Sequence, residues 1–185
     1  MADSNITKKA LAKALQELME EMPFEKINVA QICGRCDMNR KSFYYHFQDK
    51  YDLVNWIFDT DFISFALVEN HHLSYEDRWK SIEGVCNYFY ENRSFYRKAL
   101  QIKGENSFPE HFREYIQPLL RERLTDLYEG EVDDFSINFY ADVVLCAIER
   151  WLLDKNCMTA PEFMFRLERV VRTGAKAFID IPKIK

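Results

Sequence analysis

The sequence predicts an all-α protein with about nine helices. Only 5 glycines and 5 prolines occur among 185 residues, which leaves little room for the repeated turns of an all-β fold. Apolar residues instead recur every three or four positions through most of the chain. Hydrophobic residues make up 48% and charged residues 30%, so the chain can bury a substantial core and lacks the composition of a membrane-embedded protein.

The first two helices are predicted from apolar spacing between end signals. Thr7 is a candidate N-cap for a first helix, which Pro23 ends. Asn28 is the candidate N-cap of a short second helix over residues 29–36. These signals predict a long helix followed by a short one.

A third and a fourth helix follow after a tight turn at residues 37–39. The third helix is short, and Phe43 and Phe47 lie one turn apart on it, so that both can anchor it in the core. Asp49 is the candidate cap of a long fourth helix over residues 51–70. Two short helices joined by a tight turn and packed on a longer one are typical of the helix-turn-helix, whose second helix reads DNA.

The rest of the chain predicts five more helices. Pro118 falls inside one of them, where we expect a kink. The expected segments are residues 74–90, 92–100, 108–128, 133–156 and one that begins after the cap residue Thr159.

The last two helices are predicted to form an antiparallel hairpin, because only a few residues connect them. The first of them is apolar almost all round, so it is either deeply buried or covered by a second chain. We therefore expect a homodimer through these two helices. The candidate interface residues are Tyr140, Ala147, Ile148, Trp151, Phe163 and Val170.

The charge distribution is uneven. The formal net charge is −5, yet the segment from Lys26 to Lys50 holds five cations and only two acidic residues. A cationic patch on an acidic protein indicates an anionic partner for that patch. Arg40 and Lys41 lie at the start of the third helix, and such side chains can read guanine edges in the major groove. Tyr44, Tyr45 and His46 can also reach outward.

Residues 7–58 resemble the DNA-binding domain of the TetR family of bacterial transcription regulators. The resemblance rests on Asn28-Val29, then Ile32-Cys33-x-x-Cys36-Asp37, then Tyr44-Tyr45-His46-Phe47 and Lys50. The sequence departs from the family pattern at Asp37, where the family usually has glycine. Aspartate can adopt the conformation that this turn needs at modest cost, so we expect a strained variant of the same turn.

The resemblance implies that some residues of this segment contact DNA bases and others contact phosphates. Base-edge contacts are implied for Arg40, Lys41 and Tyr44. Phosphate contacts are implied for Asn28, Ser42, Tyr45, His46 and Lys50. Residues 1–50 would form the helix-turn-helix domain, and residues 51–185 would form the effector-response and dimerisation domain.

The predicted function is a sequence-specific regulator that binds a pseudo-palindromic, double-stranded DNA operator as a homodimer. We expect a repressor whose DNA affinity an effector at the C-terminal domain modulates. Scattered positions in Asn55-Trp56-Ile57-Phe58, Ile148-Glu149-Arg150-Trp151 and Pro161-Glu162 resemble one branch of the family, which includes activators of dihydroxyacetone kinase operons. The alternative is therefore an activator whose C-terminal domain senses a partner protein instead of a small ligand.

Several aromatic residues are candidates for lining an effector pocket, although aromatics at helical spacing are more often plain core. The candidates are Trp56, Trp79, Tyr88, Phe89, Tyr115 and Phe139.

A Cys-x-x-Cys pair, Cys33 and Cys36, raises a third alternative, a thiol redox or zinc protein. Cysteine is small and often buried, and no second pair completes a metal site, so we interpret these thiols as packing. His71 and His72 are adjacent and point in different directions, so we expect a loop there. We predict no enzyme activity, no metal and no cofactor, and an odd count of 5 cysteines with no signal peptide indicates a cytoplasmic protein.

Overall fold

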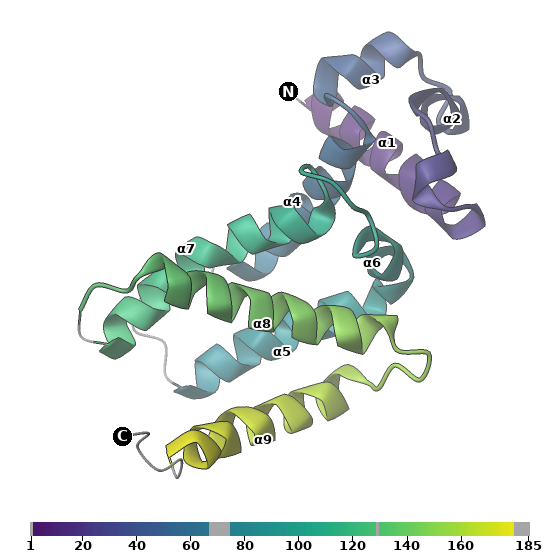
Figure 1. Cartoon of the computed structure of the whole chain (residues 1–185). Helices are drawn as coiled ribbons and strands as arrows, with labels where there is room; N and C mark the ends of the chain where they lie inside the picture. The colour runs from purple at the N-terminus through teal and green to yellow at the C-terminus, as the bar shows by residue number, and fades with distance from the viewer. Residues whose placement is uncertain (1, 67–74, 129, 180–185) are drawn as a thin grey trace.

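The structure, a computed structural model, describes residues 2–66, 75–128 and 130–179. Within these ranges the chain forms nine α-helices, one short 3-10 helix and no strand (Figure 1). The prediction of an all-α fold with about nine helices is therefore confirmed. The elements are α1 (Ala2–Glu21), η1 (Phe24–Lys26), α2 (Val29–Arg35), α3 (Arg40–His46), α4 (Lys50–Ala66), α5 (Tyr75–Glu91), α6 (Arg93–Ala99), α7 (Phe108–Tyr128), α8 (Asp134–Leu153) and α9 (Ala160–Ile179).

Local capping chemistry sets most of the helix ends that were predicted. The Asn28 side chain accepts a hydrogen bond from the Gln31 amide, and Asp133 caps α8 through the Ser136 amide. Asp49 accepts from the first amides of α4. The prediction that Thr7 caps α1 is wrong, because α1 already begins at Ala2. Its polar first turn is compatible with helix, so the helix extends past the candidate cap.

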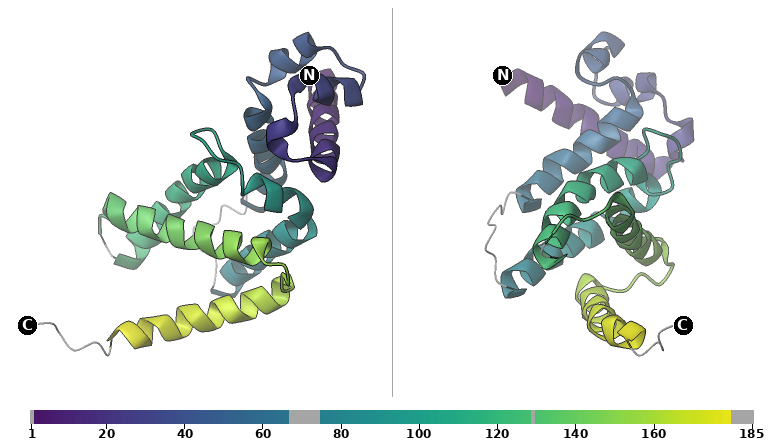
Figure 2. Two further views of the ribbon diagram at one scale, coloured as in Figure 1. Left: turned by 45° about the vertical axis from the view of Figure 1, so that its right-hand side comes forward. Right: turned by 60° about the vertical axis from the view of Figure 1, so that its left-hand side comes forward.

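The helices divide the molecule into two ends (Figure 1). Helices α1, α2 and α3 lie at one end, and α4 leads from them to the other, where α7 packs on α8 and α5 packs on α9. Figure 2 shows α9 running back antiparallel to α8 after the connection between them. At that corner Trp151 of α8 and Phe163 of α9 stack with ring centroids 4.1 Å apart.

One apolar core runs through both ends of the molecule. Its densest part is a group of aromatic rings around Phe58, which is fully buried. The Phe58 ring lies 4.6 Å from the ring of Phe62 and 5.3 Å from that of Phe108, measured between centroids. Phe89 and Phe112 belong to the same group. Aromatic side chains thus fill the space that α4, α5 and α7 enclose.

No helix in the described part of the chain is long and apolar enough to cross a membrane. The adjacent histidines, His71 and His72, lie outside the described residues.

Candidate DNA-binding interface

Helix α2 is a short supporting helix that is fixed at its N-terminus by a reciprocal cap. The Gln31 amide donates to the Asn28 side chain over 3.0 Å, and the Asn28 amide donates to the Gln31 side chain over 2.9 Å. This capping box satisfies two amides that a helix start otherwise leaves unpaired. Ile32 and Cys33 are its buried residues. A helix of seven residues needs such anchoring, because isolated short helices are unstable.

The turn between α2 and α3 contains the one non-glycine residue with positive φ among the described residues. Asp37 has φ of 52°. The next amide, that of Met38, donates to the carbonyl of Cys33 over 2.9 Å. This is the 6→1 hydrogen bond of a Schellman motif, which requires a residue in the left-handed conformation just beyond the helix end. The expectation that aspartate adopts the conformation of the usual glycine is confirmed.

Helix α3 has one buried and one exposed face. Phe43 is 0% exposed and Phe47, the residue at its C-terminal end, is 3% exposed, which confirms them as anchors. Asn39 caps the N-terminus by accepting a hydrogen bond from the Ser42 amide over 2.8 Å. The Ser42 hydroxyl lies 3.3 Å from the same Asn39 oxygen. The two anchors and the cap together fix which side chains face solvent.

The exposed face carries the side chains for which the sequence predicts base contacts. Arg40 and Lys41 are exposed, and no hydrogen bond or ion pair within the described part of the chain engages either side chain. Tyr44 is 59% exposed and Tyr45 is 82% exposed. The ring of the half-buried His46 lies edge-on to that of Tyr45, with centroids 4.8 Å apart. A cationic start followed by exposed tyrosine side chains suits a groove lined by phosphates and base edges.

Lys50 does not share this exposed position. Its ammonium group donates to the carbonyls of Phe24 and Ile27, over 2.7 and 2.8 Å, and lies 3.4 Å from that of Glu25. It also lies 4.3 Å from the centre of the Phe24 ring. Desolvation lowers the pKa of this half-buried group. An ammonium group has three N–H donors, so these carbonyls compete with the predicted phosphate contact.

The sequence offered no sign of this bond, because η1 was not predicted. The carbonyls of Phe24 and Glu25 in the 3-10 helix, and of Ile27 directly after it, accept hydrogen bonds from Lys50 at the start of α4. Asn28, the cap of α2, follows directly on this segment. Lys50 therefore supports the element that positions α2.

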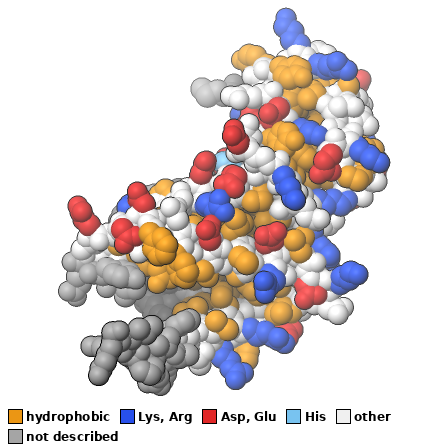
Figure 3. All heavy atoms as spheres, viewed as in Figure 1, with side chains coloured by type: hydrophobic (Ala, Val, Ile, Leu, Met, Phe, Trp, Pro, Cys, Tyr) orange, Lys and Arg blue, Asp and Glu red, His pale blue; other side chains and the backbone are white. Residues whose placement is uncertain are grey.

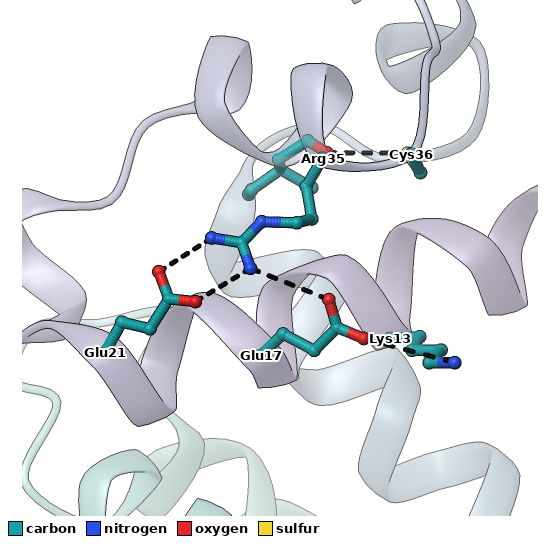
Figure 4. A network of polar contacts seen from close by, with 6 residues as sticks. Lys13, Glu17, Glu21, Arg35 and Cys36 are labelled. Atoms are coloured by element: carbon teal, nitrogen blue, oxygen red, sulfur yellow. Dashed lines mark hydrogen bonds and ion pairs between the residues drawn. The ribbon is translucent and has the colours of Figure 1, made fainter.

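Arg35 also does not contribute to the predicted cationic patch, because its charge is paired with acidic side chains of α1 (Figure 4). Its guanidinium group donates to both carboxylate oxygens of Glu21, over 2.8 and 2.6 Å, and lies 3.8 Å from Glu17. The hydrogen bond from Arg35 lowers the pKa of Glu21. This two-pronged pair joins α2 to α1. The cations that remain available for DNA on α3 are Arg40 and Lys41.

A surface groove of about 710 Å³ separates α3 from the start of α2. The residues that line it include Arg40 and Tyr44 of α3, Asn28 and Gln31 at the start of α2, and Lys50. The groove is open to solvent. Its lining includes residues predicted to contact bases, Arg40 and Tyr44, and one predicted to contact phosphate, Asn28. The structure thus brings Asn28 close to Arg40 and Tyr44, as a shared DNA surface requires.

The two thiols of the Cys-x-x-Cys pair face inward. Cys33 is 2% exposed, and the Cys36 thiol lies 3.4 Å from the carbonyl of Ile32. Desolvation raises the pKa of both thiols, which disfavours the thiolate needed for redox or metal chemistry. No group of three or more metal-binding side chains occurs in the part of the chain that the structure describes. These observations favour the interpretation of the pair as packing.

Comparison with known proteins agrees with this geometry. Residues 10–57 match the family described as "Bacterial regulatory proteins, tetR family", and residues 77–173 match the one described as "Transcriptional regulator C-terminal region". A curated relative from Lactococcus lactis subsp. lactis (strain IL1403), the "HTH-type dhaKLM operon transcriptional activator DhaS", is 30% identical over 156 residues, which is 81% of each chain. The chain belongs to the TetR family of bacterial transcription regulators.

Solved structures of TetR-type proteins share the fold. A structure of the dihydroxyacetone kinase operon activator DhaS has a TM-score of 0.63 at 23% identity and covers 93% of this chain and 97% of its own. A TetR regulator from Streptococcus agalactiae 2603V has a TM-score of 0.65 at 20% identity, with coverage of 92% and 96%. The fold prediction and the branch of the TetR family suspected from the sequence are both confirmed.

The predicted effector-pocket residues do not form one group. Tyr88, Phe89 and Tyr115 lie within the aromatic core, where Tyr88 bonds to Asp61 over 2.9 Å and to Tyr96 over 2.7 Å. The other three lie elsewhere. Trp56 lies edge-on to Phe47 at the start of α4, Trp79 is half-buried on α5, and Phe139 is 52% exposed on α8.

The predicted dimer residues also separate into two classes. Ile148 and Trp151 are 7% and 3% exposed, so they pack in the core of their own chain and offer little surface to a second one. Tyr140, Ala147 and Phe163 are half-buried, and Val170 is 65% exposed. The prediction erred on α8 because an almost uniformly apolar helix does not reveal which of its faces the chain itself covers.

Exposed apolar side chains that the prediction missed lie beside these residues. Phe135, Phe139 and Val143 are 79%, 52% and 50% exposed and follow one another at helical spacing on α8. On α9, Phe165 and Val171 are 68% and 58% exposed. Figure 3 shows hydrophobic side chains gathered over the N-terminal half of α8. The spacing of four residues in Phe135, Phe139 and Val143 was the signal that could have found this stripe.

Proposed function

We propose that the protein binds a pseudo-palindromic operator as a homodimer and regulates transcription from it. The observation that carries this proposal is one face of α3, where Arg40, Lys41, Tyr44 and Tyr45 are exposed while Phe43 holds the opposite face in the core. Residues 1–50 supply this face, and residues 51–185 dimerise and respond to an effector.

In this proposal the side chains of the exposed face divide between bases and phosphates. Arg40, Lys41 and Tyr44 read base edges from the start and middle of α3. The phosphates that flank the major groove of the DNA are contacted by Asn28, Ser42, Tyr45 and His46. Lys50 is not included among these phosphate contacts. It is assigned a supporting role instead, because its ammonium group bonds to the carbonyls of Phe24 and Ile27.

Dimerisation proceeds through the exposed stripe of α8, Phe135, Phe139 and Val143, together with Val170 and its exposed neighbours on α9. An apolar stripe of this kind favours burial against a symmetric copy. A two-fold dimer places its two α3 helices in successive major grooves, about 34–36 Å apart.

A second candidate concerns the effector. The aromatic core around Phe58 is closely packed, with rings of Phe62, Phe89, Phe108 and Phe112 in contact. Such packing favours an activator that senses a partner protein over a repressor with a small ligand in its core. The name of the Lactococcus lactis relative, a transcriptional activator, supports the same candidate.

The test is selection of bound fragments from genomic DNA with the purified protein, followed by footprinting and sedimentation. We expect fragments with two half-sites related by approximate two-fold symmetry, bound by one dimer. Fragments without shared sequence, or binding by a monomer to a single half-site, would contradict the proposal.

A further inference from the structure

Helix α6 reaches the C-terminal end of α1, which belongs to the DNA-binding end of the molecule. The Lys98 ammonium group donates to the carbonyl of Met19 and, over 3.2 Å, to that of Glu20. Both carbonyls lie in the last turn of α1, where a helix leaves its carbonyls without internal partners and carries partial negative charge. An ammonium group is the complementary partner for such an end.

The neighbouring residue of α6 makes the corresponding contact with the other end of the molecule, formed by α5–α9 and called the regulatory end below. The Arg97 guanidinium group lies 3.4 Å from the carbonyl of Leu153, the last residue of α8. Helix α6 packs on both α1 and α8, and lies between them in Figure 1. Two consecutive cations of one short helix therefore join the end of α1 to the end of α8.

This connection is separate from the covalent one. Along the chain, α4 alone leads from α1–α3 to the rest of the molecule, and a domain carried on one helix can pivot about that helix. The packing of α6 on α1, which includes the Lys98 contact, is a second attachment that restrains this rotation. It lies far from the start of α4 in sequence and acts on a different helix of the DNA-binding end.

We propose that Lys98 is a positioning residue for operator binding: its contact with the end of α1 fixes the angle between the DNA-binding end and α8, and so sets the half-site spacing that the dimer accepts. This inference rests on the proposed function, because it requires a dimer formed through α8 and α9. Lys98 itself contacts no DNA. Its effect is on the separation and direction of the two α3 helices.

The contact can be removed without opening the core. An open groove of about 480 Å³ runs along α6 and is lined by Lys98, Arg97 and Gln101 among others, so water can reach this surface. In Lys98→Met the apolar stem of the side chain is kept, and water can hydrate the freed carbonyls of α1. Lys98→Gln is a second variant, shorter and neutral. Lys98→Arg keeps a cationic donor, and Lys103→Met is a matched control on an exposed lysine.

The experiment measures affinity for the tightest genomic fragment and for two derivatives whose half-site spacing is one base pair longer or shorter. Each base pair changes the separation by about 3.4 Å and the direction by about 34°. For Lys98→Met and Lys98→Gln we expect about fivefold weaker binding at the natural spacing, at the low end of coupling factors between sites, and a smaller preference for that spacing. The salt dependence should not change, because no phosphate contact is lost. Lys98→Arg and Lys103→Met should behave as wild type.

A spacing preference in Lys98→Met and Lys98→Gln equal to that of wild type would overturn the inference, as would a loss that Lys98→Arg fails to restore. Failure of the wild-type protein to select any DNA would instead refute the proposed function on which the inference rests. The two failures are distinguished by the wild-type measurement alone.

Discussion

The DNA-binding end and the regulatory end of this protein are held together by different kinds of contact. In the DNA-binding end, short helices are positioned by directed polar bonds, such as the capping box of Asn28 and the carbonyl contacts of Lys50. In the regulatory end, long helices pack through aromatic rings, with Phe58 at the centre of one group and Trp151 at the corner of α8 and α9. The first arrangement fixes the directions of a few exposed side chains, whereas the second fills the space between long helices with buried rings.

From this comparison we expect the largest loss of stability when a buried aromatic side chain of the regulatory end is removed. The Trp151 ring stacks on that of Phe163 at 4.1 Å and its indole N–H donates to the carbonyl of Met158 over 2.8 Å. Trp151→Ala should lower the free energy of unfolding by about 3–5 kcal/mol, as for other large residues removed from a core. Chemical denaturation at several protein concentrations measures this loss.

Phe139→Ala is the matched control, because Phe139 lies on the same helix but is 52% exposed. We expect it to weaken the dimer in sedimentation experiments and to change the stability of the folded chain little. If Trp151→Ala weakened the dimer and left stability unchanged, the interpretation of Trp151 as core would be wrong.

The contrast also explains what could be predicted from the sequence. Caps act over three residues, so Asn28 and Asp49 and the helix starts they define were readable from the chain. The buried side of α8 was not, because it depends on which face α7 and α6 cover, and no pattern within α8 itself shows that. The supporting role of Lys50 was hidden for a related reason, since its acceptors lie more than twenty positions earlier, in η1 and at Ile27 directly after it.

The next largest effect concerns recognition and leaves stability almost unchanged. Arg40 is exposed on α3, and its side chain makes no hydrogen bond or ion pair with the described parts of its own chain. Arg40→Ala should reduce the preference for operator over random DNA by about 1–3 kcal/mol, the usual value of one good base contact. Binding titrations on both DNAs measure it, with Arg35→Ala as a control that should mainly lower stability. Equal losses on operator and random DNA would mean that Arg40 contacts phosphate and not bases.

Lys50→Met tests the directed bonds of the DNA-binding end. Loss of the ammonium group frees the carbonyls of Phe24 and Ile27, and we expect about 1–2 kcal/mol lower stability, typical for charged hydrogen bonds that are partly exposed. Operator affinity should fall because α2 is no longer held. The slope of log affinity against log salt should stay as in wild type. A slope that becomes shallower by about one would show that Lys50 neutralises a phosphate.

The smallest effect is expected at Asp37, and it has the opposite sign. A left-handed conformation costs an L-residue about 1–2 kcal/mol, and glycine avoids that cost but loses about 0.5–1 kcal/mol more backbone entropy on folding. Asp37→Gly should therefore stabilise the protein by roughly 0.5–1 kcal/mol, measured by denaturation. Asp37→Asn removes the charge and keeps a residue that tolerates this conformation, so it should change stability less. If Asp37→Asn stabilised the protein as much as Asp37→Gly, the gain would come from removal of the charge. The left-handed conformation of Asp37 would then not be a source of strain in the turn between α2 and α3.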